Sequence, residues 1–464
     1  MKQLRIMVLS KKKIKRRFLK ITASIIGLYF IISLYFINHF FFHTEINGVN
    51  VSLKAHATAL DAFNNYIDDY KLQLTGRDGL TEVITGKEIG LKCRENNAAS
   101  QIDSLQNPLL WITALFKGKK YYVKGLYGYD ADLLNSRLLR LKCLNGKIIP
   151  PKNASFKYKD GSYETIKETY GNKIKKDKLI KAVNSCLSLG KTSLDLNARH
   201  CYETPKFKLT SEKTIKTKNL LNKYVSTRIT YKFGSTKEQL DGTIIHKWLS
   251  VNGNLDVVIN RQAVEEYVHE LSSQYNTVGI SREFQTATGK LIEVKGGIYG
   301  WRINREAETE ALLKNIRQGA VLEKEPVYLQ KAVSREGNEI GDTYIEINIT
   351  RQHLWLFKNG KLVVQGSVVT GNPGRGNATT TGVYMINYKQ KNATLSGPGY
   401  EAPVTYWMPF FGNIGLHDAS WRSHFGGNIY RQRGSHGCVN APIYLAKKVF
   451  ENIESGTPVV LYEE

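Results

Sequence analysis

The stretch Gly434-Ser435-His436-Gly437-Cys438-Val439-Asn440 decides the class of the C-terminal domain, and His417 lies eighteen positions before Ser435. A thiol becomes a useful nucleophile only as the thiolate, so it needs an imidazole or a positive dipole beside it. The glycine before the thiol lets the backbone turn sharply and leaves neighbouring N–H groups able to face a developing oxyanion. The pattern therefore predicts acyl transfer through a thioester, with Cys438 as the nucleophile and His417 as its base.

Two other interpretations fit the same residue types. Zinc could be bound by four nearby side chains of the ligand type: His417, His424, His436 and Cys438. Their spacing matches neither C-x-x-C nor H-E-x-x-H, so we predict no metal and no cofactor. Cys438 could instead be an inert buried thiol and His417 a core histidine, which is the usual outcome when each occurs alone.

The flanking residues extend the pattern in both directions. They read Tyr406-Trp407-Met408-Pro409-Phe410, then Gly415-Leu416-His417-Asp418-Ala419-Ser420-Trp421-Arg422, then Phe425-Gly426-Gly427. Together with the cysteine stretch, these segments closely resemble the catalytic domain of the L,D-transpeptidases of bacterial cell-wall synthesis. The resemblance runs from about Tyr344 to Leu461 and implies a mainly-β, β-sandwich-like fold that holds the thiol on a loop.

Two positions depart from the family pattern. Asp418 follows His417 where many relatives have glycine, and Thr380 stands in place of a proline in the element Thr379–Gly382. A missing proline loosens a turn but removes no reactive group. The departures therefore leave the expected chemistry intact.

The resemblance implies a two-step reaction on peptidoglycan stem peptides. Cys438 would attack the carbonyl of the third residue of a tetrapeptide and expel the terminal D-Ala, and an amine of a neighbouring stem would resolve the thioester. His417 would carry the thiol proton, oriented by the backbone carbonyl of Asp418, with the Asp418 carboxylate as the open alternative. The N–H groups of Gly437 and Cys438 are the predicted oxyanion donors.

Further residues are assigned supporting or binding roles. We expect Ser435 and His436 to order the loop, with a role as a second base as the alternative for His436, and Asn440 to hold the turn after the thiol through side-chain hydrogen bonds. The predicted substrate groove consists of Tyr406, Trp407, Phe410, Trp421 and Arg422. Arg422 could bind a substrate carboxylate. Simple packing of the aromatic side chains and solvation of the arginine are the alternatives.

Two other classes of function remain open. Water could resolve the same thioester, which would make the protein an L,D-carboxypeptidase, and the sequence does not separate hydrolysis from transfer. The second class is a non-catalytic wall-binding protein, although the intact His417 and Cys438 argue against it. Irreversible acylation by carbapenem-type β-lactams is expected only of an enzyme.

The composition agrees with a protein that faces the cell wall. The chain has 464 residues, which suits two or three domains rather than one. Lys and Arg number 66 against 41 Asp and Glu, so the net charge of +25 favours an anionic partner. No nucleic-acid-reading motif is present, and the lysines beyond the N-terminal tail are scattered. We therefore predict the wall and lipid headgroups as partners, and no nucleic acid.

The N-terminus predicts a membrane anchor. Residues 1–17 contain eight Lys and Arg and no acidic side chain, and residues 18–42 are almost wholly apolar. About twenty apolar residues in a helix cross a hydrocarbon core of ~30 Å. The basic tail should stay in the cytoplasm, which would leave a single-pass membrane protein with its catalytic domain facing the wall. A cleaved signal peptide is the alternative, although no small-x-small site follows the apolar stretch.

An internal repeat lies between the anchor and the catalytic domain. One copy runs through Asp160–Ile166, Tyr170–Ile174, Lys178–Leu189 and Thr192–Leu196, and the later copy through Gly289–Val294, Tyr299–Ile303, Glu306–Gln318 and Pro326–Leu329. Each predicts strand, turn, strand, helix and strand. This α+β material resembles the peptidoglycan-binding module often found before such catalytic domains, with a plain spacer as the alternative. We expect a divergent module at 43–205, a peptidoglycan-binding module at 206–335 and the catalytic domain at 341–464.

Four cysteines besides Cys438 lie outside the anchor: Cys93, Cys143, Cys186 and Cys201. In an oxidising compartment they could form two disulfides, with Cys186 and Cys201 closing a small loop and Cys93 and Cys143 as the second pair. Cys438 would then be the odd thiol, as a nucleophile should be.

Within the catalytic domain the sequence predicts mostly strands. They are expected at 344–349, 353–357, 362–370, 382–388 and 459–462. Asn359-Gly360 between two apolar runs predicts a hairpin turn, and one helix is expected at 443–453, between Pro442 and Gly456.

Overall fold

The computed structural model describes residues 2–94, 101–102, 104–397 and 400–464. The chain forms two compact units. The first comprises Met1–Ser155 and Thr165–Thr214, and the second comprises Phe156–Glu164 and Ile215–Glu464. The chain therefore passes from the first unit into the second at residue 156 and returns to the first unit at residue 165. It enters the second unit again at residue 215 and stays there.

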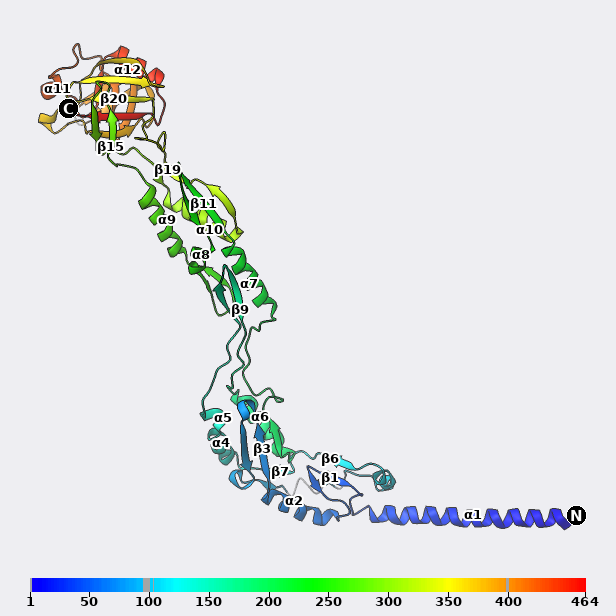
Figure 1. Cartoon of the computed structure of the whole chain (residues 1–464). Helices are drawn as coiled ribbons and strands as arrows, with labels where there is room; N and C mark the ends of the chain where they lie inside the picture. Colours follow the sequence, from blue (N-terminus) through cyan, green and yellow to red (C-terminus); the bar gives the residue numbers. More distant parts are fainter. Residues whose placement is uncertain (1, 95–100, 103, 398–399) are drawn as a thin grey trace. The chain divides into compact units, whose positions relative to one another are not determined.

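The first unit begins with one long helix, α1 (Lys2–Tyr35), drawn in blue in Figure 1. Its segment Lys12–Tyr35, which has 24 residues, is long and apolar enough to cross a membrane. A signal sequence can have the same length and composition. The predicted apolar span reaches residue 42, but the helix ends at Tyr35. The following residues fold back, because Phe36, Phe40 and Phe41 bury their rings instead of continuing the helix.

Directly after α1 comes a small sheet of short strands. It consists of β1 (Thr44–Ile46), β2 (Val49–Asn50) and β6 (Lys119–Tyr121), in the order β2-β1-β6. Further short elements of the unit include β5 (Lys92–Cys93), η4 (Pro108–Leu115), β7 (Tyr127–Gly128), α4 (Ala131–Leu139) and α5 (Lys142–Asn145).

The main α+β module of the first unit is built around a three-stranded sheet. Its elements are α2 (Ala59–Asp68), β3 (Lys71–Thr75), β4 (Thr81–Thr85), α6 (Lys176–Ser188) and β10 (Ser193–Asp195). β4 pairs antiparallel and β10 parallel with β3, which gives the order β10-β3-β4. Leu72 and Leu74 alternate with polar residues along β3, so both point into the core, where they join Phe63 of α2.

The same strand pairing recurs in the second unit, around β11 (labelled in Figure 1). Its elements are α7 (Glu212–Val225), β11 (Arg228–Phe233), β12 (Thr236–Leu240), α9 (Arg261–Tyr275), α10 (Arg305–Gln318) and β18 (Val321–Lys324). β12 pairs antiparallel and β18 parallel with β11, in the order β12-β11-β18. Smaller elements are α8 (Gly242–Ile245), β13 (Leu249–Val251), β14 (Val257–Ile259), β15 (Arg282–Gln285), β16 (Leu291–Val294), β17 (Arg302–Ile303) and β19 (Tyr328–Gln330). The two modules thus share one pairing pattern, as an internal repeat predicts.

The elements of the repeat differ from the predicted ones. Tyr170–Ile174 forms no strand, since Ile174 makes only an isolated bridge with Tyr202. The predicted strand at 160–166 is half of a hairpin, β8 (Ser155–Lys159) with β9 (Ser162–Ile166), and its Tyr163 packs in the second unit. Alternation of apolar and polar residues along a sequence indicates a strand. Which strand it pairs with is decided by the tertiary structure.

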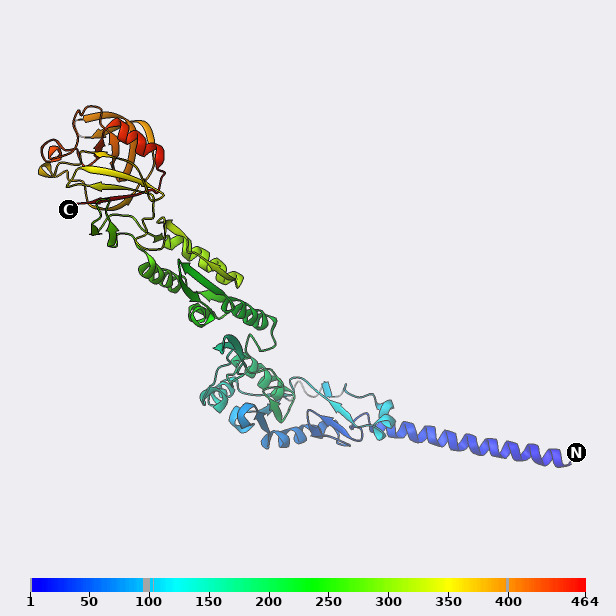
Figure 2. The ribbon, with the colours of Figure 1, turned by 45° about the horizontal axis from the view of Figure 1, so that its top comes forward.

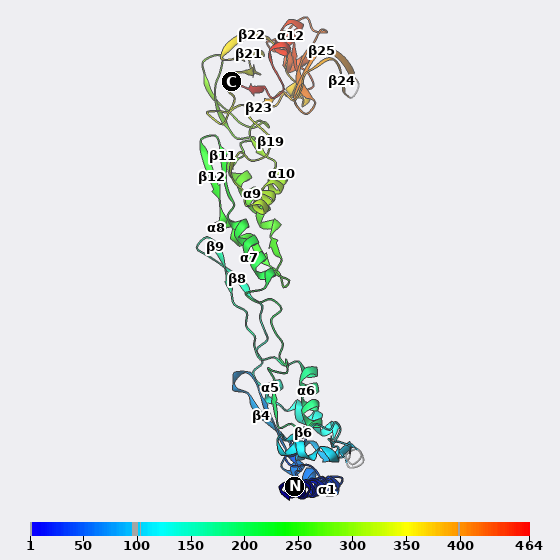
Figure 3. The ribbon, with the colours of Figure 1, turned by 90° about the vertical axis from the view of Figure 1, so that its right-hand side faces the viewer.

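Two sheets that share one core form the C-terminal domain (Figure 3). The five-stranded sheet, in the order β22-β21-β20-β28-β23, contains β20 (Tyr344–Asn348), β21 (His353–Lys358), β22 (Lys361–Ser367), β23 (Gly382–Met385) and β28 (Pro458–Tyr462). The four-stranded sheet, β24-β25-β26-β27, contains β24 (Gln390–Gly397), β25 (Tyr400–Phe411), β26 (Ile414–Asp418) and β27 (Val439–Ala441). Helix α12 (Ile443–Asn452) contacts β22, β25 and β26 (Figure 2), and α11 (Ile429–Arg433) is one short turn.

The strands and the helix predicted for this domain are present, with ends shifted by a few residues. The predicted turn joins β21 to β22, and Asn359 and Gly360 have φ values of +48° and +73°, as the common two-residue hairpin turn requires. The β24–β25 hairpin was not predicted. Its first strand reads Gln-Lys-Asn-Ala-Thr-Leu-Ser-Gly and buries only Ala393, so it lacks the apolar alternation that indicates a strand.

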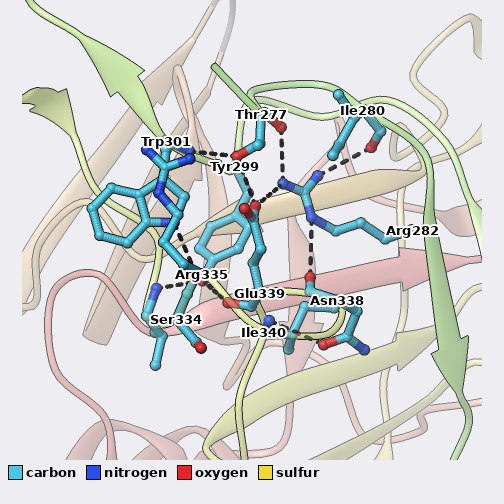
Figure 4. A network of polar contacts seen from close by, with 12 residues as sticks. Thr277, Ile280, Arg282, Tyr299, Trp301, Ser334, Arg335, Asn338, Glu339 and Ile340 are labelled. Atoms are coloured by element: carbon cyan, nitrogen blue, oxygen red, sulfur yellow. Dashed lines mark hydrogen bonds and ion pairs between the residues drawn. The ribbon is translucent and has the colours of Figure 1, made fainter. Parts of the chain in front are cut away.

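A buried ion pair joins the second module to the catalytic domain (Figure 4). The Arg282 guanidinium lies 2.6 Å from the Glu339 carboxylate and also donates to the carbonyls of Thr277, Ile280 and Asn338. The Thr277 hydroxyl donates to the same carboxylate, at 2.7 Å. Because both charges are satisfied by several hydrogen bonds, the pair can lie buried between β15 and the segment that enters the catalytic domain.

None of the five cysteines forms a disulfide in the described structure, so neither of the two pairings that the sequence left open is present there. Cys186 and Cys201 are buried in the core of the first module, and burial raises the pKa of both thiols. A buried free cysteine packs as a small apolar side chain, which is the role that these two residues have here.

Candidate active site

Four neighbouring strands bring the predicted catalytic residues to one face of a sheet. Gln390 pairs with Trp407, Trp407 with His417, and His417 with Asn440. Directly paired residues point to the same face, and this row lines a cleft of about 880 Å³. Cys438 lies two residues before Asn440 and lines the same cleft. The cysteine and the histidine, distant in sequence, therefore meet in one cavity.

His417 is held by its own strand. The side chain is buried, and Nδ1 lies 2.9 Å from the backbone carbonyl of Asp418, so Nδ1 carries the proton and Nε2 is left as the acceptor. The rings of Trp407 and Trp421 each have centroids 5.9 Å from the imidazole. Burial lowers the pKa of His417 below its ordinary value, which favours the neutral imidazole that can accept a proton.

The carboxylate of Asp418 has a separate task. Its Oδ1 accepts hydrogen bonds from the backbone N–H groups of Thr405 and Tyr406, at 2.8 and 2.7 Å. The carboxylate thereby ties β26 to β25, while the contact with the imidazole of His417 is made by the Asp418 carbonyl.

Cys438 lies at the entry to β27. Its thiol donates toward the carbonyl of Asn413, at 3.6 Å, and the backbone N–H of Gly415 is directed at the sulfur. Burial raises the pKa of the Cys438 thiol, and the hydrogen bond from Gly415 opposes that shift. Each of the two shifts, taken by itself, favours the neutral form of its group.

The loop before the thiol is fixed by two hydroxyl groups. The Ser435 hydroxyl donates to the carbonyl of Cys438 and accepts from the N–H of Gly437, at 3.1 Å. The Thr379 hydroxyl donates to the carbonyl of Gly437, at 2.7 Å, and accepts from the N–H of Gly371, at 2.8 Å. Gly437 has a φ of +118°, which only glycine adopts readily. Its N–H is occupied within the loop, which argues against the prediction that this N–H serves as an oxyanion donor.

The predicted groove is divided by the alternation of β25. Trp407 lines the cleft together with Trp421 and Arg422. Tyr406 and Phe410 do not: Tyr406 packs on Phe450, and Phe410 is buried in the core. Neighbouring residues of a strand point to opposite faces, so the aromatic run could not place all of its rings in one groove.

Two polar side chains of the cleft have unsatisfied atoms. The Oδ1 of Asn440 and the Nε of Arg422 are buried without a hydrogen-bond partner in the described structure. Asn440 was expected to hold the turn through its side chain, but its backbone makes that connection, in both directions with Val369, at 2.9 Å. Burial lowers the pKa of Arg422, which nevertheless stays charged, as arginine does in proteins. An unpaired amide oxygen and a half-buried cation both suit a polar ligand.

Among the residues that the structure describes, no group of three or more His, Cys, Asp or Glu side chains is placed to hold a metal ion. His436 is exposed and lines the cleft, while His424 contacts the hydroxyl of Ser423, at 2.9 Å.

Several residues of the site were not predicted. No role was predicted for Thr379 from the sequence. Its position in the element Thr379–Gly382, which corresponds to a common element of the family, was the one signal that could have indicated such a role. Tyr388, Ser396, Glu401 and Asn413 also line the cleft. They come from the β24–β25 hairpin and from the connections that flank it, and no sequence pattern indicated how that hairpin would pair.

Comparisons with known proteins agree with this architecture. The family profile described as an L,D-transpeptidase catalytic domain matches residues 342–461, and the profile of a peptidoglycan-binding domain matches residues 87–194 and 207–322. No curated protein matches the chain.

Solved structures of L,D-transpeptidases resemble the chain. The Ldtfm–avibactam carbamoyl enzyme is 33% identical over 54% of this chain and 99% of its own, with a TM-score of 0.44. A cysteine-to-serine mutant of an Enterococcus faecium L,D-transpeptidase is 32% identical over 54% of this chain and 100% of its own, with a TM-score of 0.43. The catalytic domain of an E. faecium L,D-transpeptidase acylated by ertapenem is 41% identical over 26% of this chain and 98% of its own, with a TM-score of 0.25.

The chain therefore belongs to the L,D-transpeptidase family. At the level of that family it is a peptidoglycan transpeptidase, and a peptidoglycan-binding domain precedes its catalytic domain.

Proposed function

We propose that this protein is a membrane-anchored L,D-transpeptidase that joins two peptidoglycan stem peptides through a thioester on Cys438. The observation that carries this proposal is the shared cleft, which is lined both by the Cys438 side chain and by the His417 imidazole, whose Nδ1 is committed to a backbone carbonyl. That arrangement leaves Nε2 of His417 as the base. The carbonyl of Asp418 orients the imidazole, which is the task of the third residue in a catalytic triad.

In the first step, the sulfur of Cys438 attacks the carbonyl carbon of the third residue of a tetrapeptide stem. The S–C bond forms, the thiol proton passes to Nε2 of His417, and the amide C–N bond to the terminal D-Ala breaks. The same proton then passes from His417 to the departing amine, so that free D-Ala leaves and the stem remains as a thioester. Of the two predicted oxyanion donors, the N–H of Cys438 is the one that we assign to the developing negative charge.

In the second step, an amine of a neighbouring stem attacks the thioester. His417 takes a proton from the amine, the new amide C–N bond forms, and the S–C bond breaks. The proton returns to the sulfur, which restores the neutral thiol. Hydrolysis would follow the same path with water as the nucleophile, and it would yield a tripeptide instead of a cross-link.

Two cleft residues are proposed to bind the donor stem. Arg422 offers a half-buried guanidinium to the carboxylate of the terminal D-Ala, and the free Oδ1 of Asn440 accepts a hydrogen bond from a backbone N–H of the stem. Because the Oδ1 of Asn440 and the Nε of Arg422 are buried, neither forms a hydrogen bond with bulk water. A substrate group that forms a hydrogen bond with either atom is therefore bound favourably.

The rest of the chain is proposed to hold the enzyme at the wall. The segment Lys12–Tyr35 of α1 is assigned as an uncleaved anchor, with the basic tail on the cytoplasmic side. The two α+β modules are assigned to peptidoglycan binding, as the matched profile describes.

The test is product analysis with the full chain in detergent. The protein is incubated with a disaccharide-tetrapeptide, and the products are identified by mass spectrometry. We expect a cross-linked dimer that has lost one D-Ala, and no such product from Cys438→Ala. The matched control is Cys143→Ala, which removes a thiol from the first unit and should leave the product unchanged.

The alternatives give different products. A tripeptide without a dimer would show an L,D-carboxypeptidase. No product with several stem chemistries, together with no acylation of Cys438 by a carbapenem, would overturn the enzymatic proposal in favour of wall binding alone.

A further inference from the structure

A continuous apolar segment lies beside the outer part of α1. The 3₁₀ helix η4 (Pro108–Leu115) and the following Phe116 contain no charged residue. Leu109, Leu110, Ile112, Leu115 and Phe116 all have exposed side chains, and Phe116 is 88% exposed. A contiguous apolar surface of this kind marks an interaction site, because isolated exposed residues occur on every protein but runs of them do not.

The segment is fixed against the helix by its inward-facing residues. Trp111 and Ala114 are buried in a cluster with Phe36 and Phe41, and the Trp111 ring lies 5.7 Å from that of Tyr29. The hydroxyl of Tyr29 donates to the carbonyl of Leu109. Figures 1 and 2 show this short helix beside the C-terminal end of α1. The exposed apolar side chains are therefore continuous with the apolar surface of α1.

The position of the contact along α1 gives its depth. Tyr29 lies six residues before Tyr35, the last residue of the helix. At 1.5 Å per residue this is about 9 Å along the axis, well inside one half of a hydrocarbon core of about 30 Å. If α1 spans the membrane, η4 lies at the depth of the outer leaflet.

Two polar side chains at this segment are satisfied by its own backbone, as an apolar medium requires, whereas the indole N–H of Trp111 is buried without a partner in the described structure. The side chain of Asn107 caps the first turn by accepting from the N–H of Leu109, at 3.0 Å, and the hydroxyl of Thr113 donates to the carbonyl of Leu110, at 2.7 Å. Lys117, Lys119 and Lys120 follow directly. Lysines beside an apolar segment are placed to reach the phosphates of lipid headgroups.

We propose that Pro108–Phe116 is a second membrane-contacting element, which inserts its Leu, Ile and Phe side chains into the outer leaflet beside α1. The occupant of this apolar surface is then the acyl-chain region of the bilayer. The proposal rests on the proposed anchorage of α1 and adds a second attachment, which fixes the first module at the membrane surface instead of leaving it on a flexible tether.

The experiment uses the full chain in liposomes of phosphatidylglycerol and phosphatidylcholine, with and without bromine on the acyl chains. Bromine quenches tryptophan that touches the hydrocarbon. Trp111 is the only tryptophan before residue 248, so Trp111→Phe removes the native signal of the first unit. In this background, tryptophan is introduced by Phe116→Trp, by Phe30→Trp in α1, and by Leu209→Trp at an exposed site of the same unit as the water-facing control.

We expect the added emission of Phe116→Trp to be lost to the same extent as that of Phe30→Trp, and the added emission of Leu209→Trp to persist. Quenching at position 30 without quenching at 116 would overturn the proposal and leave the anchor intact. A red-shifted emission at 116 would then show contact with water. A blue-shifted emission that reddens on dilution would show a second copy of the chain on this surface.

Absence of quenching at both positions would overturn the anchor together with the present inference. Quenching at 116 but not at 30 would support lipid contact by this segment and reject α1 as the anchor.

Discussion

At the scale of single residues, the proposed chemistry depends on the buried His417 and the partly buried Cys438, whose pKa values are both shifted toward the neutral forms. Burial lowers the pKa of His417 and raises that of Cys438. A thiol in this state is protected from adventitious oxidation, because the thiolate is the reactive form. The proton is expected to move to His417 only as the sulfur attacks a carbonyl.

The pH dependence of acylation follows from the shift of His417. In the proposed mechanism the neutral imidazole is the active form, and its pKa is lowered, so activity should persist below the ordinary histidine value of about 6.5 and fall only at more acid pH. The measurement is the second-order rate constant of carbapenem acylation as a function of pH. His424→Gln, which removes an exposed histidine, should leave the profile unchanged. A midpoint above the ordinary value would contradict a neutral resting pair.

The guanidinium of Arg422 gives a second prediction at this scale. Arg422→Gln should lower kcat/KM for the tetrapeptide by about tenfold to a hundredfold, as expected when a charged hydrogen bond worth ~1.5–3 kcal/mol is lost. Most of the change should appear in KM. The control is Arg431→Gln, an exposed arginine of α11. Unchanged kinetics of Arg422→Gln would remove this residue from the binding site.

At the scale of elements, the loop that carries Cys438 is fixed by a hydrogen bond from Thr379, in the connection between β22 and β23. The Thr379 hydroxyl bridges the carbonyl of Gly437 and the N–H of Gly371, which lie on different strand connections. Thr379→Val keeps the shape but leaves two buried backbone groups unpaired, at a cost of roughly 2 kcal/mol. We expect slower acylation of Cys438 and a lower Tm. Thr380→Val, at the exposed neighbouring position, is the matched control, and equal behaviour of the two variants would refute the role.

At the scale of the whole molecule, the joint between the second module and the catalytic domain is a buried polar network. Removing one partner of a buried ion pair leaves an uncompensated charge, which typically costs about 3–5 kcal/mol. Glu339→Gln should therefore lower the Tm of the second unit markedly, whereas Glu323→Gln, which breaks exposed pairs with Lys232 and Lys237, should not. Thermal unfolding followed by near-UV circular dichroism separates these outcomes. A small change in Tm for Glu339→Gln would contradict this prediction. It would mean that water reaches the Arg282 guanidinium and compensates its charge.

The sequence by itself determined the family, the mainly-β catalytic domain, most of its strands and the repeated α+β material. These depend on local signals, namely the motif around Cys438, the turn at Asn359-Gly360 and the periodicity of apolar residues. Only the tertiary structure decided the rest. It divided the aromatic run of β25 between cleft and core, paired the polar strand β24 with it, and left the described cysteines without a disulfide. It also placed Thr379 under the catalytic loop and η4 beside α1. The physical reason is the same in each case: which face of a strand or helix is covered depends on its partner, and that partner is distant in the sequence.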